Sequence, residues 1–270
     1  MIAMSGDGTR LHYIVEGSGP PLVLVGGKTS SIDGAWWRYI TPPSPHRGRL
    51  LPVLATRLKV IAFDNRGAGA SDKPDTPYSM QLMAEDALAV LRDAGETSAH
   101  WFGLSMGGMI LQELALRHPD AVRSLILGAT HCGGEHPPTG GAGNAPAIAG
   151  PLRRFANLYD TSFIAEHPDW VQEDASHFGK MPLHAIVRQD QAVKQHNLCG
   201  RLGEIRQPVL ILHGRQDRMV PVARAEELQR GLPNARLQIL QGGHQVHSEQ
   251  FATVLPLILD FVAEVERRRT

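Results

Sequence analysis

Short apolar runs alternate with longer segments of helical periodicity along this chain, and this alternation limits its possible folds more than any other feature. The runs with the least polar content span residues 21–25, 59–63, 100–102, 124–127 and 209–212, with a further candidate at 236–240. Continuous Val, Leu and Ile without polar alternation are typical of strands covered on both faces. The sequence therefore predicts an α/β protein with a mostly parallel sheet flanked by helices, entered by an antiparallel strand at residues 11–15.

Helical spacing is clearest at residues 80–92, where apolar side chains follow a three-four repeat and Gly95 offers a stop signal. Further helices are expected at residues 106–118, 223–230 and 251–268. A parallel α/β fold commonly uses a chain of 270 residues as one unit, so we expect one domain.

Two stretches break the alternation. Residues 41–49 are rich in Pro, Arg and Gly and are expected to form a loop insertion. The longer stretch, residues 131–200, begins with a Gly- and Pro-rich loop and continues into polar helical segments. Open α/β sheets bind ligands at the carboxyl ends of their strands, so this insertion is predicted to be a lid over a substrate pocket. The predicted core is then residues 1–130 and 201–270, and the lid is 131–200.

The charge balance and the amino-terminal residues limit the kinds of partner and the location that we expect for this protein. Lys and Arg number 27 and Asp and Glu number 27, so the chain lacks the basic surplus expected of a protein that binds nucleic acid or an anionic membrane. Residues 1–10 do not resemble a secretory signal, and no run approaches the length of a membrane span. We therefore expect a cytoplasmic protein that acts on a small molecule, with its oligomeric state left open.

The cysteines and histidines do not suggest a metal site. Cys132 and Cys199 are the only cysteines, too few for a disulfide framework, and are predicted to be reduced, packed thiols. The histidines of residues 131–200 have no regular ligand spacing. No metal and no cofactor are expected.

The strongest local motif is Gly103-Leu104-Ser105-Met106-Gly107, which directly follows a predicted strand and directly precedes a predicted helix. A serine on so tight a turn needs small residues two positions to either side, and both are glycine here. The following helix points its amino terminus at the serine hydroxyl, which favours negative charge developing there. Ser105 is therefore predicted to be a nucleophile.

A serine hydroxyl needs a base to take its proton and an acid to orient that base. Asp217 follows the predicted strand at residues 209–212, and His244 follows the one at 236–240. The order Ser, Asp, His, with separations of 112 and 27 residues, favours Asp217 as the acid and His244 as the base. Alternatives are Asp174 or Asp190 as the acid, and His247 as the base.

These motifs resemble the α/β-hydrolase superfamily, particularly its small lidded esterases, enol-lactonases, C–C bond hydrolases and cofactor-free haloperoxidase-like members. The similar segments are residues 21–27, 63–72, 102–108, 213–221 and 242–250. The resemblance implies the α/β-hydrolase fold, a mostly parallel eight-stranded sheet with an inserted helical lid. It also implies an oxyanion hole formed by the backbone N–H groups of Met106 and Lys28.

The chain departs from the family pattern at two positions. The early loop usually begins His-Gly, whereas this chain has Gly26-Gly27-Lys28, and Ala68 stands where a histidine is usual. Gly26-Gly27-Lys28-Thr29 also resembles the end of a phosphate-binding loop, but the first glycine of that motif would fall at Leu22, inside a strand. Nucleotide binding is therefore not favoured.

The predicted function is hydrolysis of a carboxylic ester or lactone through an acyl-enzyme, with Ser105, Asp217 and His244 as the triad. Gly27, Trp37 and His247 are candidate pocket residues; the alternatives are that Trp37 packs in the core, as such tryptophans more often do, and that His247 only packs. Alternatives with the same triad are C–C bond hydrolysis and a cofactor-free perhydrolase reaction. A ligand receptor that keeps the fold without turnover is a third possibility.

Overall fold

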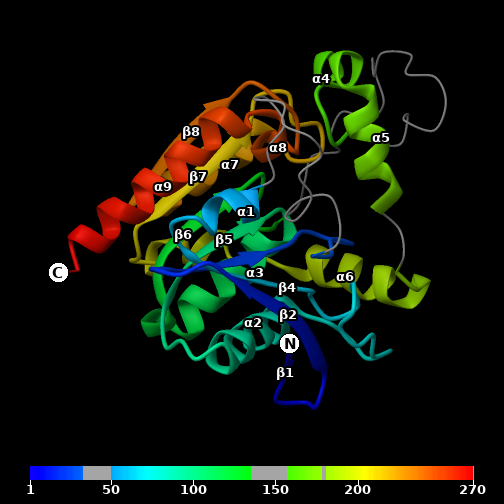
Figure 1. The fold of residues 1–270 in the computed structure, drawn as a ribbon, viewed down its shortest axis with the longest axis vertical. Coiled ribbons are helices and arrows are strands. Elements are labelled where there is room, and N and C mark those ends of the chain that lie inside the picture. Colours follow the sequence, from blue (N-terminus) through cyan, green and yellow to red (C-terminus); the bar gives the residue numbers. More distant parts are fainter. Residues whose placement is uncertain (33–49, 135–156, 178–180, 270) are drawn as a thin grey trace.

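The computed structural model describes residues 1–32, 50–134, 157–177 and 181–269. An eight-stranded sheet runs through the molecule in the order β1-β2-β4-β3-β5-β6-β7-β8 (Figure 1). The strands are β1 (Ile2–Met4), β2 (Arg10–Glu16), β3 (Pro21–Val25), β4 (Lys59–Phe63), β5 (Ala99–Leu104), β6 (Val122–Gly128), β7 (Val209–Gly214) and β8 (Ala235–Leu240).

The sheet is parallel from β4 to β8 and antiparallel only at its amino-terminal edge. β2 pairs antiparallel with both β1 and β4, whereas β3, β4, β5, β6, β7 and β8 pair parallel. This confirms the predicted mostly parallel sheet. Parallel strands with crossover helices bring all their carboxyl ends to one edge, and that edge is where a ligand site is expected.

Two apolar cores cover the two faces of the sheet. Alternate side chains of β3 divide between them, with Val23 and Val25 in one core and Leu22 and Leu24 in the other. The first core is completed by α2 (Met80–Asp93), α3 (Met106–Arg117) and α7 (Val222–Gly231), and the second by α1 (Leu50–Leu54) and α9 (Phe251–Arg267). Coverage on both faces explains why the strands are continuously apolar.

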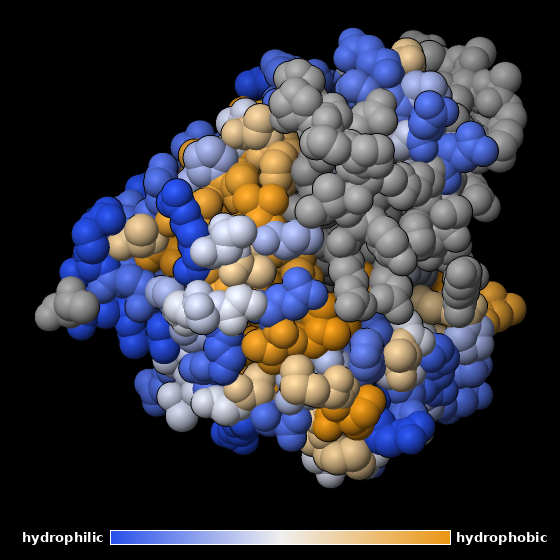
Figure 2. All heavy atoms as spheres, viewed as in Figure 1, coloured by the Kyte–Doolittle hydropathy of each residue, from blue (hydrophilic) through white to orange (hydrophobic). Residues whose placement is uncertain are grey.

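Apolar and hydrophilic residues are also separated along α9 at the outer surface. On the face drawn in Figure 2, hydrophobic side chains gather where α9 meets α1, and hydrophilic residues cover the carboxyl end of α9. The apolar residues Leu255 and Leu259 of α9 are partly buried against the second core. A helix with one apolar face therefore packs on the sheet while its charged end lies in water.

The predicted elements agree with the observed ones to within two residues at each end for helices and strands. The Ser79 hydroxyl caps α2 by accepting the Leu82 N–H at 3.1 Å, which fixes where that helix begins. The sequence did not predict β1, because its three residues are too few to show a period. The predicted insertion at 41–49 lies outside the described residues.

Helices occupy the described part of the segment 131–200, and no strand does. They are α4 (Thr161–Glu166), α5 (Pro168–His177) and α6 (Leu183–Gln195), and they lie to one side of the sheet in Figure 1. They fall in the crossover between β6 and β7. Their role as a lid stays a prediction.

The prediction of reduced cysteines was wrong, because Cys132 and Cys199 form a disulfide with an S–S distance of 2.00 Å. The two residues are 67 positions apart, so the sequence did not show that they meet. The backbone brings them together through the Leu198 N–H, which donates to the Cys132 carbonyl at 2.7 Å, and through a bridge between Gly133 and Asn197. The disulfide therefore joins the two ends of the predicted lid.

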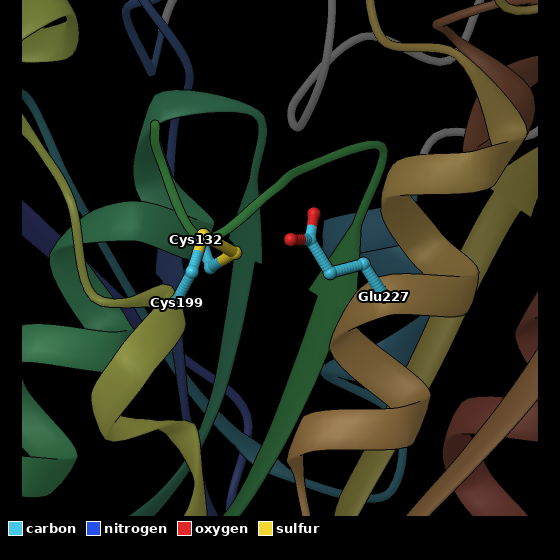
Figure 3. A group of neighbouring side chains, drawn as sticks. All are labelled: Cys132, Cys199 and Glu227. Carbon is cyan, nitrogen blue, oxygen red and sulfur yellow. A yellow bond between two sulfur atoms is a disulfide. The ribbon is translucent and has the colours of Figure 1, made fainter. Parts of the chain in front are cut away.

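Glu227 of α7 lies beside this disulfide (Figure 3). One ligand atom from each of Cys132, Cys199 and Glu227 lies within 4.8 Å of the others. The sulfurs are bonded to each other, so they are not the thiolates that bind a metal.

Every helix in the described ranges is too short or too polar to span a lipid bilayer.

Candidate active site

Ser105 occupies a strained turn between β5 and α3. Its φ and ψ are 54° and −117°, a conformation that a residue with a side chain rarely adopts. A Cβ on Gly103 would lie 2.5 Å from the Gly107 carbonyl oxygen, and one on Gly107 would lie 2.1 Å from the Val25 carbonyl oxygen. Glycine is therefore required at both positions by the close approach of backbone, as the motif predicted.

Backbone hydrogen bonds link the strand ends around Ser105. The Ser105 N–H donates to the Gly128 carbonyl at 2.8 Å, and the Ala129 N–H donates to the Leu212 carbonyl at 2.9 Å. The Thr130 hydroxyl also donates to the Ser105 carbonyl at 2.7 Å. The serine turn is thus held rigidly at the carboxyl edge of the sheet, beside the ends of β6 and β7.

Asp217 and His244 meet at this same edge. Asp217 follows β7 and His244 follows β8, and His244 Nδ1 lies 2.8 Å from Asp217 Oδ2. Both residues are buried. A carboxylate at Nδ1 places the ring proton there and leaves Nε2 free to accept a proton, which is the tautomer a general base needs.

The second carboxylate oxygen of Asp217 also accepts hydrogen bonds. Its Oδ1 accepts the N–H groups of Met219 at 2.8 Å and Val220 at 2.9 Å. Burial raises the pKa of Asp217, but the charge and hydrogen bond of His244 and the hydrogen bond from the Val220 N–H outweigh it, so that the pKa lies below its ordinary value. Asp217 is therefore an ionised acid at neutral pH.

His213 is a second histidine near Asp217 that the sequence analysis did not single out. Its Nε2 donates to the Val220 carbonyl at 2.8 Å and lies 3.5 Å from Asp217 Oδ2. Burial lowers the pKa of His213, so its ring is neutral at neutral pH. Its hydrogen bond to the Val220 carbonyl supports the turn after β7.

The alternative acids and base have other positions. Asp190 accepts a hydrogen bond from Lys28 Nζ at 2.9 Å, and the side chain of Asp174 lies outside the described part of the chain. His247 is buried in α8 (Val246–Glu249), where its ring meets the ring of Phe102 edge-on at 6.4 Å between centroids. The structure therefore brings Asp217 to His244, and His247 packs against the core.

Met106 and the early loop lie next to each other. The first turn of α3 approaches the end of β3 so closely that a Cβ on Gly107 would also lie 2.9 Å from the Gly26 carbonyl oxygen. Gly27 is buried and accepts the Ser30 N–H at 3.3 Å, and Lys28 is partly exposed. The backbone of residues 26–28 thus borders the helix start that carries the Met106 N–H.

The segment 63–72 braces this early loop, a role that the sequence analysis did not identify. Asn65 Nδ2 donates to the Gly26 carbonyl at 3.0 Å, and Asp64 Oδ1 accepts the Ile32 N–H at 2.7 Å. The Asp64 carboxylate also excludes a side chain at position 69, because a Cβ on Gly69 would lie 2.2 Å from it. These contacts hold both ends of the loop without the histidine that usually begins it.

The proposed triad has one link that the described contacts do not contain. No hydrogen bond joins Ser105 to His244 among the described residues, although both lie at the same edge of the sheet. Catalytic hydrogen bonds are often long in a free enzyme and shorten when substrate binds.

Trp37, a candidate pocket residue, lies outside the described residues.

A hollow of about 410 Å³ opens beside the loop that carries His244. Residues of α4 and of the α8 to α9 junction line it, together with Gln241 and Gly242. None of Ser105, Asp217 and His244 lines it, so this hollow is separate from the candidate catalytic residues.

Comparison with known proteins places the chain in a family. The family model described as serine aminopeptidase, S33, matches residues 54–250. A 2-hydroxymuconate semialdehyde hydrolase from Pseudomonas sp. (strain CF600) is 28% identical over 98% of this chain and 94% of its own length.

Solved structures share the fold. One described as Est816, an N-acyl homoserine lactone degrading enzyme, has a TM-score of 0.80 and 27% identity, covering 96% of this chain and 99% of its own. A thermophilic esterase from Thermogutta terrifontis has a TM-score of 0.82 and 21% identity, covering 98% of each chain. The chain therefore belongs to the α/β-hydrolase superfamily, in the family described as serine aminopeptidase, S33.

Proposed function

We propose that this protein is a serine hydrolase that cleaves a carboxylic ester or a lactone of a small molecule through an acyl-enzyme. The observation that carries the proposal is the strained turn at Ser105, at the same sheet edge as the hydrogen-bonded pair of His244 and Asp217. A strained serine and a buried, hydrogen-bonded acid and base pair at the same sheet edge favour catalysis over a non-catalytic receptor.

In the proposed mechanism, His244 Nε2 accepts the Ser105 hydroxyl proton as Oγ attacks the substrate carbonyl. Asp217 stabilises the resulting imidazolium, and its low pKa keeps it ionised throughout. The backbone N–H groups of Met106 and Lys28 stabilise the tetrahedral oxyanion. His244 then protonates the leaving alcohol, and water activated by the same imidazole releases the acid and restores Ser105.

The choice of ester or lactone as substrate is supported by one relative. The solved structure at 27% identity belongs to a protein described as degrading N-acyl homoserine lactones. Acyl transfer from an ester or lactone needs only the triad and an oxyanion hole, the two features that we propose for this chain.

A second candidate function is hydrolysis of a C–C bond beside a carbonyl. The 2-hydroxymuconate semialdehyde hydrolase, similar along nearly the whole chain, favours it. In that reaction water adds to a ketone and the leaving group is a carbanion, which needs a substrate that can delocalise the charge.

Steady-state assays decide between the two. We expect turnover of p-nitrophenyl esters of short acyl chains and of simple lactones, and loss of that turnover in Ser105→Ala. A preference for a ring-cleavage dienoate over every ester and lactone by about 100-fold in kcat/KM, roughly 2.7 kcal/mol, would support the C–C reaction instead. Wild-type esterase activity in Ser105→Ala would disprove the proposal.

A further inference from the structure

We infer that Gln189, on helix α6, is a positioning residue for the oxyanion hole, fixing the loop that carries the Lys28 N–H. The inference rests on the proposed function, since it concerns that same site. Gln189 lies in the predicted lid, more than 80 residues after Ser105 in the chain, and does not touch the triad in the described contacts. It would act through the backbone of residues 28 and 29.

Both polar atoms of the Gln189 side-chain amide form hydrogen bonds to the backbone of the core. Its Oε1 accepts the Thr29 N–H at 2.9 Å, and its Nε2 donates to the Arg66 carbonyl at 3.0 Å. The side chain is completely buried. A buried amide with both groups satisfied fixes the distance between its two partners, because moving either one leaves a buried polar group unpaired.

Thr29 needs such support. Its φ is 63°, a left-handed conformation that is strained for a β-branched residue. The bond to Gln189 fixes the direction of the Thr29 N–H, and with it the plane of the peptide between Lys28 and Thr29. That peptide follows Lys28 directly, so holding it restricts the backbone at Lys28 and the direction in which the Lys28 N–H points.

The residue after Gln189 contacts the same loop. Lys28 Nζ donates to Asp190 Oδ1 at 2.9 Å, so that two consecutive residues of α6 hold two consecutive residues of the loop. The Lys28 and Asp190 side chains are each about one third exposed, which makes this ion pair a weak contact beside the buried amide.

Helix α6 also packs closely on the core one turn before Gln189, at Ala185. A Cβ on Gly67 would lie 3.1 Å from the Ala185 Cβ, so the segment that follows β4 sits directly against the helix. The carbonyl of Arg66 in this segment is the second partner of Gln189. The position of α6 on the core is therefore linked, through Gln189, to the position of the oxyanion loop.

The test uses Gln189→Met, which keeps the length and packing of the side chain and removes both hydrogen bonds. Arg188→Ala is the matched control, because Arg188 joins the same helix to the core through Asp75 at 3.1 Å and does not contact the loop. For each purified full-length variant, kcat and KM are measured on p-nitrophenyl acetate, together with inhibition by phenylboronic acid, whose tetrahedral adduct resembles the oxyanion.

We expect Gln189→Met to lower kcat by about 10- to 100-fold and to weaken phenylboronic acid by a similar factor, with KM within about 3-fold of wild type. Arg188→Ala should change kcat and inhibition by less than about 2-fold. Gln189→Leu also removes both hydrogen bonds and serves if the methionine variant does not fold, with a kcat expected below that of Arg188→Ala.

The inference is overturned if the Gln189 variant that folds matches Arg188→Ala in kcat and in boronic acid inhibition. It is also overturned if KM alone rises, since that pattern indicates lost substrate binding. Failure of the proposed function would look different, because wild-type protein would then not react with a fluorophosphonate at Ser105.

Discussion

His244 Nδ1 lies 2.8 Å from Asp217 Oδ2, while Oδ1 of the same carboxylate accepts the N–H groups of Met219 and Val220. The two oxygens of Asp217 therefore have separate tasks. Oδ2 sets the tautomer of His244, and Oδ1 holds the turn after β7.

This division makes Asp217→Asn a selective change. The amide oxygen can still accept from Met219 and Val220, but the amide nitrogen would face His244 Nδ1 with a donor and move the ring proton to Nε2. We expect kcat on p-nitrophenyl acetate to fall by about 10³- to 10⁴-fold. The melting temperature should stay close to wild type, whereas Asp217→Ala should lower both. An asparagine variant with wild-type kcat would show that Asp217 has no part in catalysis.

Gly107→Ala tests the close packing behind the serine turn. The new Cβ would lie 2.1 Å from the Val25 carbonyl oxygen, which is backbone, so β3 or α3 must move. We expect a loss of at least about 2 kcal/mol in the free energy of unfolding, measured in urea. Gly203→Ala is the control, since nothing lies within 4 Å of its Cβ position, and it should change stability by about 0.5 kcal/mol or less. Equal stability of the two variants would contradict the packing described.

The disulfide between Cys132 and Cys199 should stabilise the protein. It closes a loop with a sequence separation of 67, for which chain entropy gives about 4 kcal/mol. We expect dithiothreitol to lower the melting temperature of the wild type, and the double variant Cys132→Ser, Cys199→Ser to melt at that lower temperature with or without reductant. A wild type that contains two free thiols under non-reducing conditions would show that the bridge does not form.

Glu249 should make stability fall as pH rises. Its carboxyl group is buried and accepts the N–H groups of Gly243 and Asp160 at 2.9 and 3.1 Å, and burial raises its pKa from 4.5 to about 8. Between those two values the folded protein holds a proton that the unfolded chain has lost, so folding is favoured at low pH and loses free energy as pH rises, by up to about 1.4 kcal/mol per pH unit.

The measurement is the free energy of unfolding at several pH values from about 5 to 9, for the wild type and Glu249→Gln. The glutamine variant cannot titrate at this position, so its stability should decline less steeply over this range, whatever its absolute value. Identical slopes in the two proteins would show that Glu249 is already ionised in the folded state.

The sequence predicted the parts of this fold that depend on local patterns. β3 and β4 have the predicted bounds, because apolar runs flanked by Gly, Pro or Asp identify strands without knowledge of their partners. The turn at Ser105 was predicted for the same reason, since its glycines and its serine are adjacent in the chain. Asp217 and His244 were found from their place after predicted strands, because parallel strands bring such positions to one edge.

Contacts between distant segments could not be predicted. Cys132 and Cys199 meet only because the chain returns after the segment 131–200, and no spacing rule signals this. Gln189 is one glutamine among several on a polar helix, and only the position of α6 shows that it reaches Thr29. The bracing of the early loop by Asn65 is hidden in the same way, since its partner at Gly26 belongs to another strand end.

The most direct test of the serine hydrolase proposal is labelling of the native protein with a fluorophosphonate, followed by peptide mass spectrometry. We expect one adduct, on the peptide that contains Ser105, and no adduct in Ser105→Ala or in heat-denatured protein, because only a serine with a working base and oxyanion hole reacts. An unlabelled native protein, or an adduct on another residue with Ser105 unmodified, would contradict the account.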